Sequence, residues 1–168
     1  EKELDLNIQP YLSQRVTGLN YRFLEQLANY YKEIKKMNIE IIRTPLFYGP
    51  FDNFDKNFSH IVPALIVKAL ESKNSINILG NGKTIRDIVY VEDLVKFISF
   101  IAFRKKKFLK PINFSLGKSI TIENLAKTIL KALNKENVKI NFINKSLLTS
   151  KYVLLDNKLS SKIFKFKK

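Results

Sequence analysis

Hydrophobic residues recur every three or four positions in four segments of the chain, a spacing typical of amphipathic helices. The clearest segment, residues 18–36, has apolar side chains at these positions: Leu19, Phe23, Leu27, Tyr30 and Ile34. The other helices are expected over residues 59–72, 91–101 and 122–133. Thr121 has the side chain and the position of an N-cap for the last of them.

Short apolar or alternating runs between these helices predict strands. They cover residues 39–43, 76–79, 87–90, 111–116 and 138–143. Thr44-Pro45 ends the first strand, and Gly80-Asn81-Gly82 forms a turn after the second. Strands that alternate with helices predict an α/β fold with pieces of parallel sheet.

Composition limits the class of protein. A chain of 168 residues with 45% hydrophobic residues is the size of one domain with its own core. The absence of cysteine excludes disulfides and thiolate metal sites, and it fits a cytoplasmic protein. No apolar run reaches the roughly 18–20 residues of a membrane span, and no cluster of His, Asp and Glu has metal-ligand spacing. We therefore expect a cytoplasmic protein with no membrane partner and no metal.

The net charge of +15 does not change the expected class of protein. All but five of the 30 basic residues are lysines, and they are spread along the chain. Nucleic-acid-binding proteins favour arginine forks and a concentrated basic stripe. We therefore expect a solvated basic surface and no nucleic-acid partner, although a positive field would also attract an anionic nucleotide.

Two sequence blocks carry a family resemblance. The first contains Tyr48-Gly49-Pro50, Asp52-Asn53-Phe54 and the run SHIVPAL at residues 59–65; the second is RDIVYVEDL at residues 86–94. Both resemble the extended short-chain dehydrogenase/reductases (the NAD-dependent epimerase/dehydratase family), and the first is most similar to the GDP-L-fucose synthases within it. The resemblance implies a Rossmann-like α/β fold, a nucleotide-sugar substrate, and NAD or NADP as the cofactor of the intact protein.

The dinucleotide-binding half implied by this resemblance is not visible in the sequence. The five glycines form no G-x-G-x-x-G turn, which a dinucleotide pyrophosphate requires. We therefore expect residues 1–168 to be a single partial domain, the C-terminal part of the family fold without its N-terminal half. Such a chain should bind NAD or NADP weakly or not at all. It should also expose apolar surface around Leu19, Phe23 and Ile41.

The resemblance also locates the position of the catalytic Tyr-x-x-x-Lys pair. Counting back from Tyr48 without gaps places Thr17 and Tyr21 at these two positions, and Glu25 falls where the family often has a glutamate. A threonine hydroxyl cannot be tuned for proton transfer near neutrality, and Tyr21 brings no positive charge. Tyr21 could serve as a relocated acid or simply pack on its helix.

His60, the sole histidine, is the candidate catalytic residue. A lone histidine is usually structural, but in SHIVPAL it coincides with a histidine that acts as an acid/base near the sugar in the resembling enzymes. Imidazole suits this chemistry because it exchanges protons near neutral pH. Thr44, Pro45, Leu46 and Phe47 correspond to a segment that meets the nicotinamide, so we expect them to contact the cofactor. Otherwise they simply end a strand.

Three further residues are candidates for substrate binding by the same resemblance. Arg86 corresponds to an arginine on the nucleotide diphosphate, where a guanidinium fork matches phosphate oxygens; otherwise it pairs with a nearby carboxylate. Lys68 falls on a basic substrate-binding position, and Asp156 falls on a late aspartate near the ribose. Leu79 stands where the GDP-L-fucose synthases have a tryptophan, which weakens the assignment to a GDP-sugar.

These observations leave two main interpretations open. The chain is part of a nucleotide-sugar epimerase, dehydratase or reductase, incomplete and inactive alone, or it is a degenerate module that binds a sugar nucleotide or a protein partner without catalysis. The two matching blocks make the first interpretation our prediction, and the loss of both catalytic residue types at Thr17 and Tyr21 supports the second as the alternative. A homodimer is possible under either.

Overall fold

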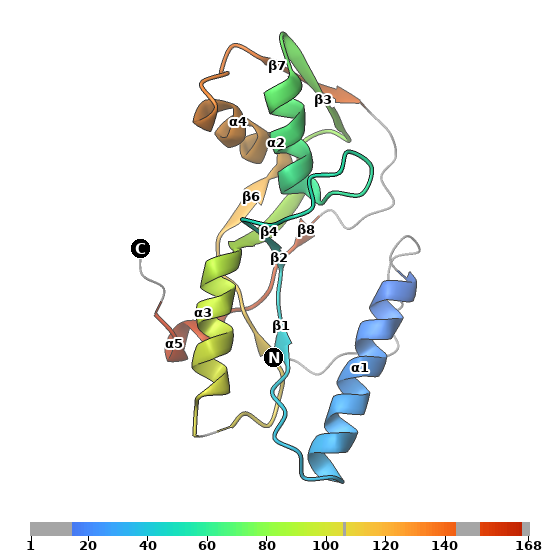
Figure 1. Cartoon of the computed structure of the whole chain (residues 1–168), viewed down its shortest axis with the longest axis vertical. Helices are drawn as coiled ribbons and strands as arrows, with labels where there is room; N and C mark the ends of the chain where they lie inside the picture. The colour runs from blue at the N-terminus through green and yellow to red at the C-terminus, as the bar shows by residue number, and fades with distance from the viewer. Residues whose placement is uncertain (1–14, 106, 144–151, 166–168) are drawn as a thin grey trace.

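The computed structural model describes residues 15–105, 107–143 and 152–165, which form five helices and eight short strands (Figure 1). In chain order the elements are α1 (Arg15–Glu33), β1 (Ile42–Arg43), β2 (Leu46–Tyr48), α2 (Ile61–Glu71), β3 (Ser75–Leu79), β4 (Ile85–Tyr90), α3 (Val91–Ala102), β5 (Ile112–Asn113), β6 (Ser119–Thr121), α4 (Ile122–Ala132), β7 (Lys139–Ile143), β8 (Tyr152–Val153) and α5 (Lys158–Ile163).

Strand β4 lies at the centre of the strand pairings. It pairs in parallel with β2 and β8 and antiparallel with β6. Two further parallel pairs, β1 with β5 and β3 with β7, lie on either side of it (Figure 1). Mostly parallel strands alternating with helices confirm the predicted α/β class.

Two hydrophobic cores flank this strand. The first, here called the α2–α4 core, gathers buried residues of α2, β3 and α4 in the upper half of Figure 1. The second, the α3 core, is centred on Phe97 and Phe114, whose ring centroids lie 4.7 Å apart. Ile88 packs against the α2–α4 core and its neighbour Val89 is buried in the α3 core. Successive side chains of a strand point to opposite faces, so β4 joins the two cores.

The helices predicted from periodicity are confirmed with small shifts at their ends. Thr121 caps α4 as expected, because its hydroxyl accepts a hydrogen bond from the Asn124 amide at 3.1 Å. Glu123 in the first turn of α4 also forms an ion pair with Lys127 at 2.6 Å. None of the helices in the described residues is long and apolar enough to cross a membrane.

Helix α1 is attached to the body of the molecule by polar contacts. The Arg43 guanidinium donates to both carboxylate oxygens of Glu25 at 2.8 and 2.7 Å, and the Lys32 ammonium donates to the Phe108 carbonyl. No residue of α1 is buried, and Leu19 and Phe23 are exposed while Ile41 is half-buried. The predicted apolar surface is therefore confirmed on the helix and is weaker at Ile41.

Lys135 closes the carboxyl end of α2. Its ammonium donates to the carbonyls of Ala69 and Leu70, both at 2.8 Å, and of Ser72 at 3.0 Å. The last carbonyls of a helix have no partner within the helix, and a cation there also faces the negative end of its dipole. Lys135 thus joins the loop after α4 to the end of α2, 63 residues or more away in sequence.

We predict that Lys135→Met lowers the free energy of unfolding by about 1–2 kcal/mol. This is the lower part of the range for hydrogen bonds from charged groups, since the ammonium is partly exposed. Urea unfolding followed by circular dichroism measures the change. Lys73→Met, at an exposed lysine beside the same helix end, is the matched control and should change stability by less than about 0.5 kcal/mol. Equal effects of the two substitutions would show that the three carbonyl contacts do not stabilise the fold.

Candidate functional site

Parallel pairing of β2 with β4 brings the two blocks of the family resemblance together. Leu46 lies opposite Ile88 and Tyr48 opposite Tyr90, and the two tyrosine rings have centroids 5.7 Å apart. Burial, together with the nearby Glu92 and Asp93 carboxylates, raises the pKa of Tyr90, so its hydroxyl is protonated at neutral pH. The Tyr-Gly-Pro turn therefore begins directly beside the start of α3.

Gly49 allows this close approach. Its φ is +156°, and a Cβ at this position would overlap Val91 Cγ1 in the first turn of α3. Glycine is the residue that tolerates both the backbone conformation and the contact. The turn and the helix start consequently pack closely together as one corner.

The loop between Gly49 and α2 is ordered by its own polar side chains. Asp55 Oδ1 accepts from the amides of Asn57 and Phe58 at 2.8 and 3.1 Å, while Asn53 Oδ1 accepts from the Asp55 amide at 2.9 Å. Phe51 is fully exposed with a φ of +66°, an uncommon conformation for a bulky side chain. The loop between Gly49 and His60 is therefore held by local hydrogen bonds and not by a hydrophobic core.

His60 occupies the N-cap position of α2 and is exposed. Its carbonyl accepts from the Ala64 amide at 3.0 Å, but its side chain makes no capping hydrogen bond. Lys68 lies eight residues further along the helix, so about 12 Å separates the two positions along its axis. The Lys68 ammonium donates to the Asn77 carbonyl of β3 at 2.8 Å. The structure therefore places the two residues at different ends of α2, and a substrate contact by Lys68 would have to replace this bond.

Arg86 is half-buried on β4, opposite Ile120 of β6 and Val153 of β8. One guanidinium nitrogen donates to the Ile85 carbonyl at 2.9 Å. Burial lowers the pKa of Arg86, but a guanidinium starts so high that it stays charged at neutral pH. Arg86 lies four residues before Tyr90 on β4. This strand pairs with β2, which leads into the Tyr-Gly-Pro turn.

Asp87, the next residue on β4, is a feature that the sequence analysis missed. It is buried, and its Oδ2 accepts from the Leu155 amide at 3.4 Å, whereas its Oδ1 has no hydrogen-bond partner among the described residues. It thus attaches the segment that contains Asp156 to the centre of the sheet. Asp156 itself is half-exposed and accepts from the Lys158 amide at 2.9 Å, at the start of α5. The available signal for Asp87 was its place two residues before Val89, which puts the carboxylate on the same face of the strand as that apolar side chain.

The residues expected to meet a cofactor do not form a dinucleotide site by themselves. Thr44 and Leu46 are half-buried, Pro45 is buried, and Phe47 is exposed in the middle of β2. Thr17 and Tyr21 lie exposed on α1, where the resemblance would require a tyrosine and a lysine. These side chains supply neither a pyrophosphate cradle nor a cation for the ribose, so we derive no hydride-transfer step from this chain.

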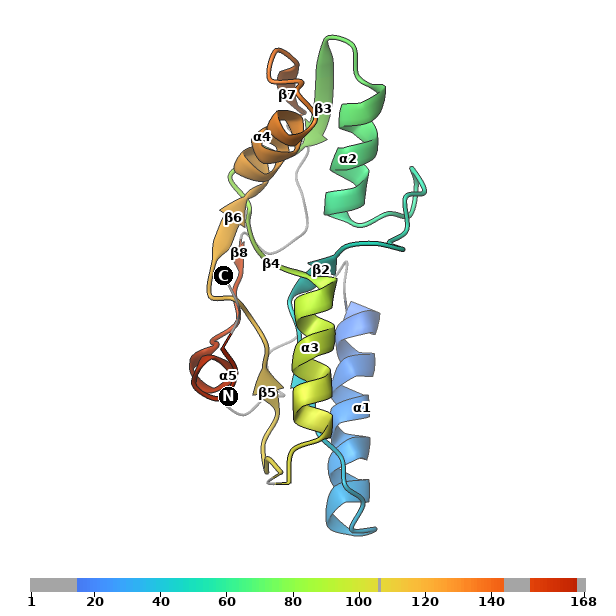
Figure 2. The same ribbon diagram turned by 60° about the vertical axis from the view of Figure 1, so that its left-hand side comes forward.

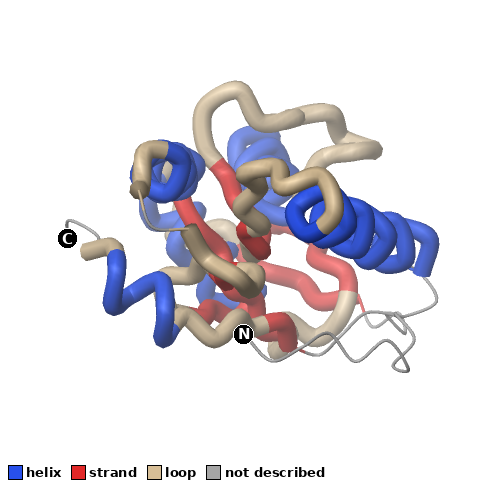
Figure 3. Tube along the Cα trace, turned by 90° about the horizontal axis from the view of Figure 1, so that it is seen from below, coloured by secondary structure: helices blue, strands red, loops and turns tan. Residues whose placement is uncertain are grey.

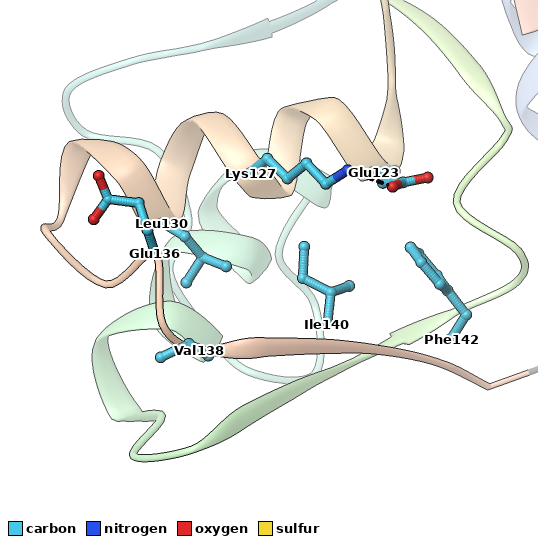
Figure 4. Close-up of a pocket in the computed structure, with 7 residues that line it drawn as sticks. All are labelled: Glu123, Lys127, Leu130, Glu136, Val138, Ile140 and Phe142. Carbon is cyan, nitrogen blue, oxygen red and sulfur yellow. Dashed lines mark hydrogen bonds and ion pairs between the residues drawn. The ribbon is translucent and has the colours of Figure 1, made fainter.

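A hollow of about 310 Å³ between α4 and β7 is lined by none of the predicted site residues (Figure 4). Its lining consists of apolar side chains with an ion pair and a further carboxylate at the rim: Leu130, Val138, Ile140, Phe142, Glu123, Lys127 and Glu136. Among the described residues, no group of three His, Cys, Asp or Glu side chains is placed to hold a metal ion.

Comparison with known proteins agrees with the two blocks. Residues 9–117 match the model of the NAD dependent epimerase/dehydratase family, which is more than half of the chain. The chain belongs to this family. GDP-L-colitose synthase of Yersinia pseudotuberculosis is 40% identical over 90 residues, covering 51% of this chain and 29% of that protein. GDP-L-fucose synthase of Dictyostelium discoideum is 27% identical over 128 residues, covering 73% and 37%.

Solved structures show the same fold over nearly the whole chain. The UDP-N-acetylglucosamine 4-epimerase of Methanobrevibacter ruminantium M1 superimposes with a TM-score of 0.76 and 25% identity, over 99% of this chain and 50% of that one. A GDP-6-OMe-4-keto-L-xylo-heptose reductase from C. jejuni gives a TM-score of 0.82 at 17% identity, over 99% and 61%. This member of the epimerase/dehydratase family therefore spans about a third of the curated relatives and half to three-fifths of these structures.

We predict that Gly49→Ala lowers the free energy of unfolding by about 1–3 kcal/mol, because overpacking a close contact costs this much. Chemical unfolding of Gly49→Ala, Val91→Ala and the double variant measures it. Val91→Ala should recover part of the loss in the double variant by making room for the new methyl group. Strictly additive losses would show that the contact with Val91 does not determine the need for glycine.

Proposed function

We propose that this chain is the nucleotide-sugar-binding portion of an epimerase/dehydratase-family enzyme, of the kind that includes GDP-L-fucose synthases. The observation that carries the proposal is the β2–β4 pairing, which joins the Tyr-Gly-Pro block, and the loop that leads from it to His60, to the strand that carries Arg86. The relatives include a GDP-L-colitose synthase and a dTDP-4-dehydro-6-deoxy-D-allose reductase, which supports a nucleoside diphosphate sugar as the ligand class.

Arg86 has the chemistry to bind the diphosphate. Its guanidinium keeps its charge while half-buried, where a charge-assisted hydrogen bond to phosphate is less screened than at the surface. The chain's charge of +15 adds a general attraction for an anionic ligand. Asp156 would face the ribose from the segment that Asp87 attaches to β4, and Lys68 would join the site after releasing the Asn77 carbonyl.

His60 would act on the sugar. Its ring is exposed and makes no capping bond, so the imidazole can give a proton to the sugar or take one from it. NAD or NADP would act in the intact enzyme, with Thr44 to Phe47 bordering the nicotinamide. The chain alone would bind the cofactor weakly, because Thr17 and Tyr21 do not replace the missing pair. Its epimerase, dehydratase or reductase activity would therefore depend on further polypeptide.

We predict that Arg86→Ala weakens binding of GDP-L-fucose by roughly ten- to a hundred-fold, equivalent to about 1.5–3 kcal/mol for a hydrogen bond to a charged group. Isothermal titration calorimetry measures the dissociation constant, and circular dichroism checks that the variant is folded. Arg104→Ala is the matched control, because Arg104 lies over the Phe100 and Phe108 rings, beyond the end of α3.

Equal weakening by the Arg86 and Arg104 substitutions would mean that overall charge, rather than a phosphate contact at Arg86, attracts the ligand. No detectable binding by the wild-type chain would contradict the proposed function itself. His60→Gln should leave GDP affinity within about two-fold, since His60 is assigned to the sugar and not to the phosphates.

A further inference from the structure

One end of the molecule carries basic and apolar side chains close together. We call it the basic end; it comprises the end of α1 with the loop that follows, and the loop after α3, residues 32–37, 103–105 and 107–110. Seven of these 13 residues are basic, five are apolar and one, Glu33, is acidic. The whole chain has 30 basic residues in 168, so they are concentrated about three-fold at the basic end.

Hydrogen bonds hold the two parts of the basic end together. The Lys32 ammonium donates to the Phe108 carbonyl, and the Phe108 amide donates to Glu40 Oε1 at 2.9 Å. Parallel pairing of β1 with β5 continues this contact, and the Ile112 amide donates to the Ile41 carbonyl. Figures 1 and 2 show the end of α1 and the loop after α3 at the lower end of the molecule, and Figure 3 views the molecule from below. Segments 68 to 76 positions apart in sequence therefore share one end of the fold.

Four of the five apolar side chains at the basic end are exposed. Phe103 and Leu109 are each 90% exposed, Ile34 is 62% exposed and Met37 is 51% exposed. The fifth, Phe108, is half-buried. Exposed apolar area is unfavourable in water, and apolar side chains that gather at one place on a surface mark an interaction site. The loop after α3 thus uses one phenylalanine in its own packing and turns the other to solvent.

This mixture of side chains fits the surface of an anionic membrane. Exposed Lys35 and Lys36 lie between Ile34 and Met37 in sequence, and exposed Lys105 follows Phe103 by two residues. Apolar side chains can enter the boundary between headgroups and acyl chains, while long basic side chains keep their charge at the level of the lipid phosphates. Anionic headgroups attract such basic clusters electrostatically.

A nucleic acid fits the same surface less well. Its phosphates would use the lysines, but they would leave the aliphatic side chains of Ile34, Met37 and Leu109 in water. Bases that stack on a protein do so on aromatic rings, and Phe103 is the one exposed ring at the basic end among the described residues. A lipid surface uses both kinds of side chain.

We propose that the basic end binds the surface of an anionic lipid bilayer, with Phe103 and Leu109 inserted at the level of the headgroups and the nearby lysines on the lipid phosphates. The contact is peripheral and needs no spanning helix. The absence of a membrane span, on which the expectation of no membrane partner rests, therefore does not bear on it. This binding goes beyond the proposed function and does not depend on a nucleotide sugar, so either proposal can fail alone.

Co-sedimentation of the 168-residue chain with lipid vesicles tests the proposal. The chain should bind vesicles of phosphatidylcholine that contain about 30% phosphatidylglycerol, and it should not bind vesicles of phosphatidylcholine alone. Added salt should weaken the binding, because it screens the attraction between lysines and headgroups. A chain that stays in the supernatant with the anionic vesicles, or that binds both kinds of vesicle equally, overturns the proposal.

A matched pair of variants tests the contribution of charge. Lys35→Gln/Lys36→Gln should raise the lipid concentration for half-maximal binding by at least about ten-fold. Lys73→Gln/Lys83→Gln removes the same charge at two exposed lysines outside the basic end, and it should change this concentration less than about three-fold. Equal effects of the two pairs would show that the overall charge of the chain binds the vesicles, and the proposed surface would be wrong.

Tryptophan fluorescence tests the insertion, because the chain contains no tryptophan. Emission of Leu109→Trp should shift to the blue with anionic vesicles and should be quenched by brominated lipids. Leu70→Trp, at another exposed leucine, on α2, should show neither change. Phe103→Ser/Leu109→Ser should weaken vesicle binding by at least about ten-fold, since its apolar contacts are lost. Circular dichroism checks that each variant is folded.

Duplex DNA at the same concentration of phosphate distinguishes a membrane from a nucleic acid. The chain should bind the anionic vesicles more tightly than the DNA, and Phe103→Ser/Leu109→Ser should weaken the vesicle binding alone. Tighter binding to DNA, together with vesicle binding that this double variant leaves unchanged, would identify the basic end as a nucleic-acid surface and overturn the membrane proposal.

Discussion

Strand β4 is the constraint on which the rest of the structure depends. Its six residues pair with three other strands, and its side chains alternate between two separate cores, with Ile88 against one and Val89 inside the other. A slip of one residue in its register would turn every side chain to the wrong face. It would expose Val89 and bring the charge of Arg86 toward the position that Asp87 now holds. The local order of both halves of the molecule therefore depends on the register of one short strand.

The same strand also determines the geometry of the candidate site. Arg86 is fixed by its place between β6 and β8, and Tyr90 by its place opposite Tyr48. The Gly49 corner then directs the loop that ends at His60. Tyr48 and Tyr90 are far apart in sequence and lie side by side because β2 and β4 pair in parallel. Lys68 lies apart from His60, because the two residues are at opposite ends of α2. Its ammonium instead contacts the Asn77 carbonyl.

The sequence alone predicted what depends on local periodicity and local chemistry. The apolar spacing of α1 and the Thr121 cap appear where they were expected, and the strand expected at 76–79 appears as β3, one residue longer. The short strands β2, β6 and β8 were missed, because runs of two or three residues have no readable alternation and extend only by pairing with β4. The buried carboxylate of Asp87 and the contacts of Lys135 with the end of α2 were also missed. Their hydrogen-bond partners lie more than 60 positions away in sequence. The site residues themselves came from the family resemblance, and their roles remain predictions.

Hydrogen–deuterium exchange of the chain with and without GDP-L-fucose tests the central claim most directly, because it reads the backbone of both blocks in one experiment. If β2 and β4 together build a nucleotide-sugar site, residues 49–60 and 85–90 gain protection together, while α4 and β7 around the separate hollow do not change. Protection confined to α4 and β7, or to one of the two blocks alone, would contradict the account.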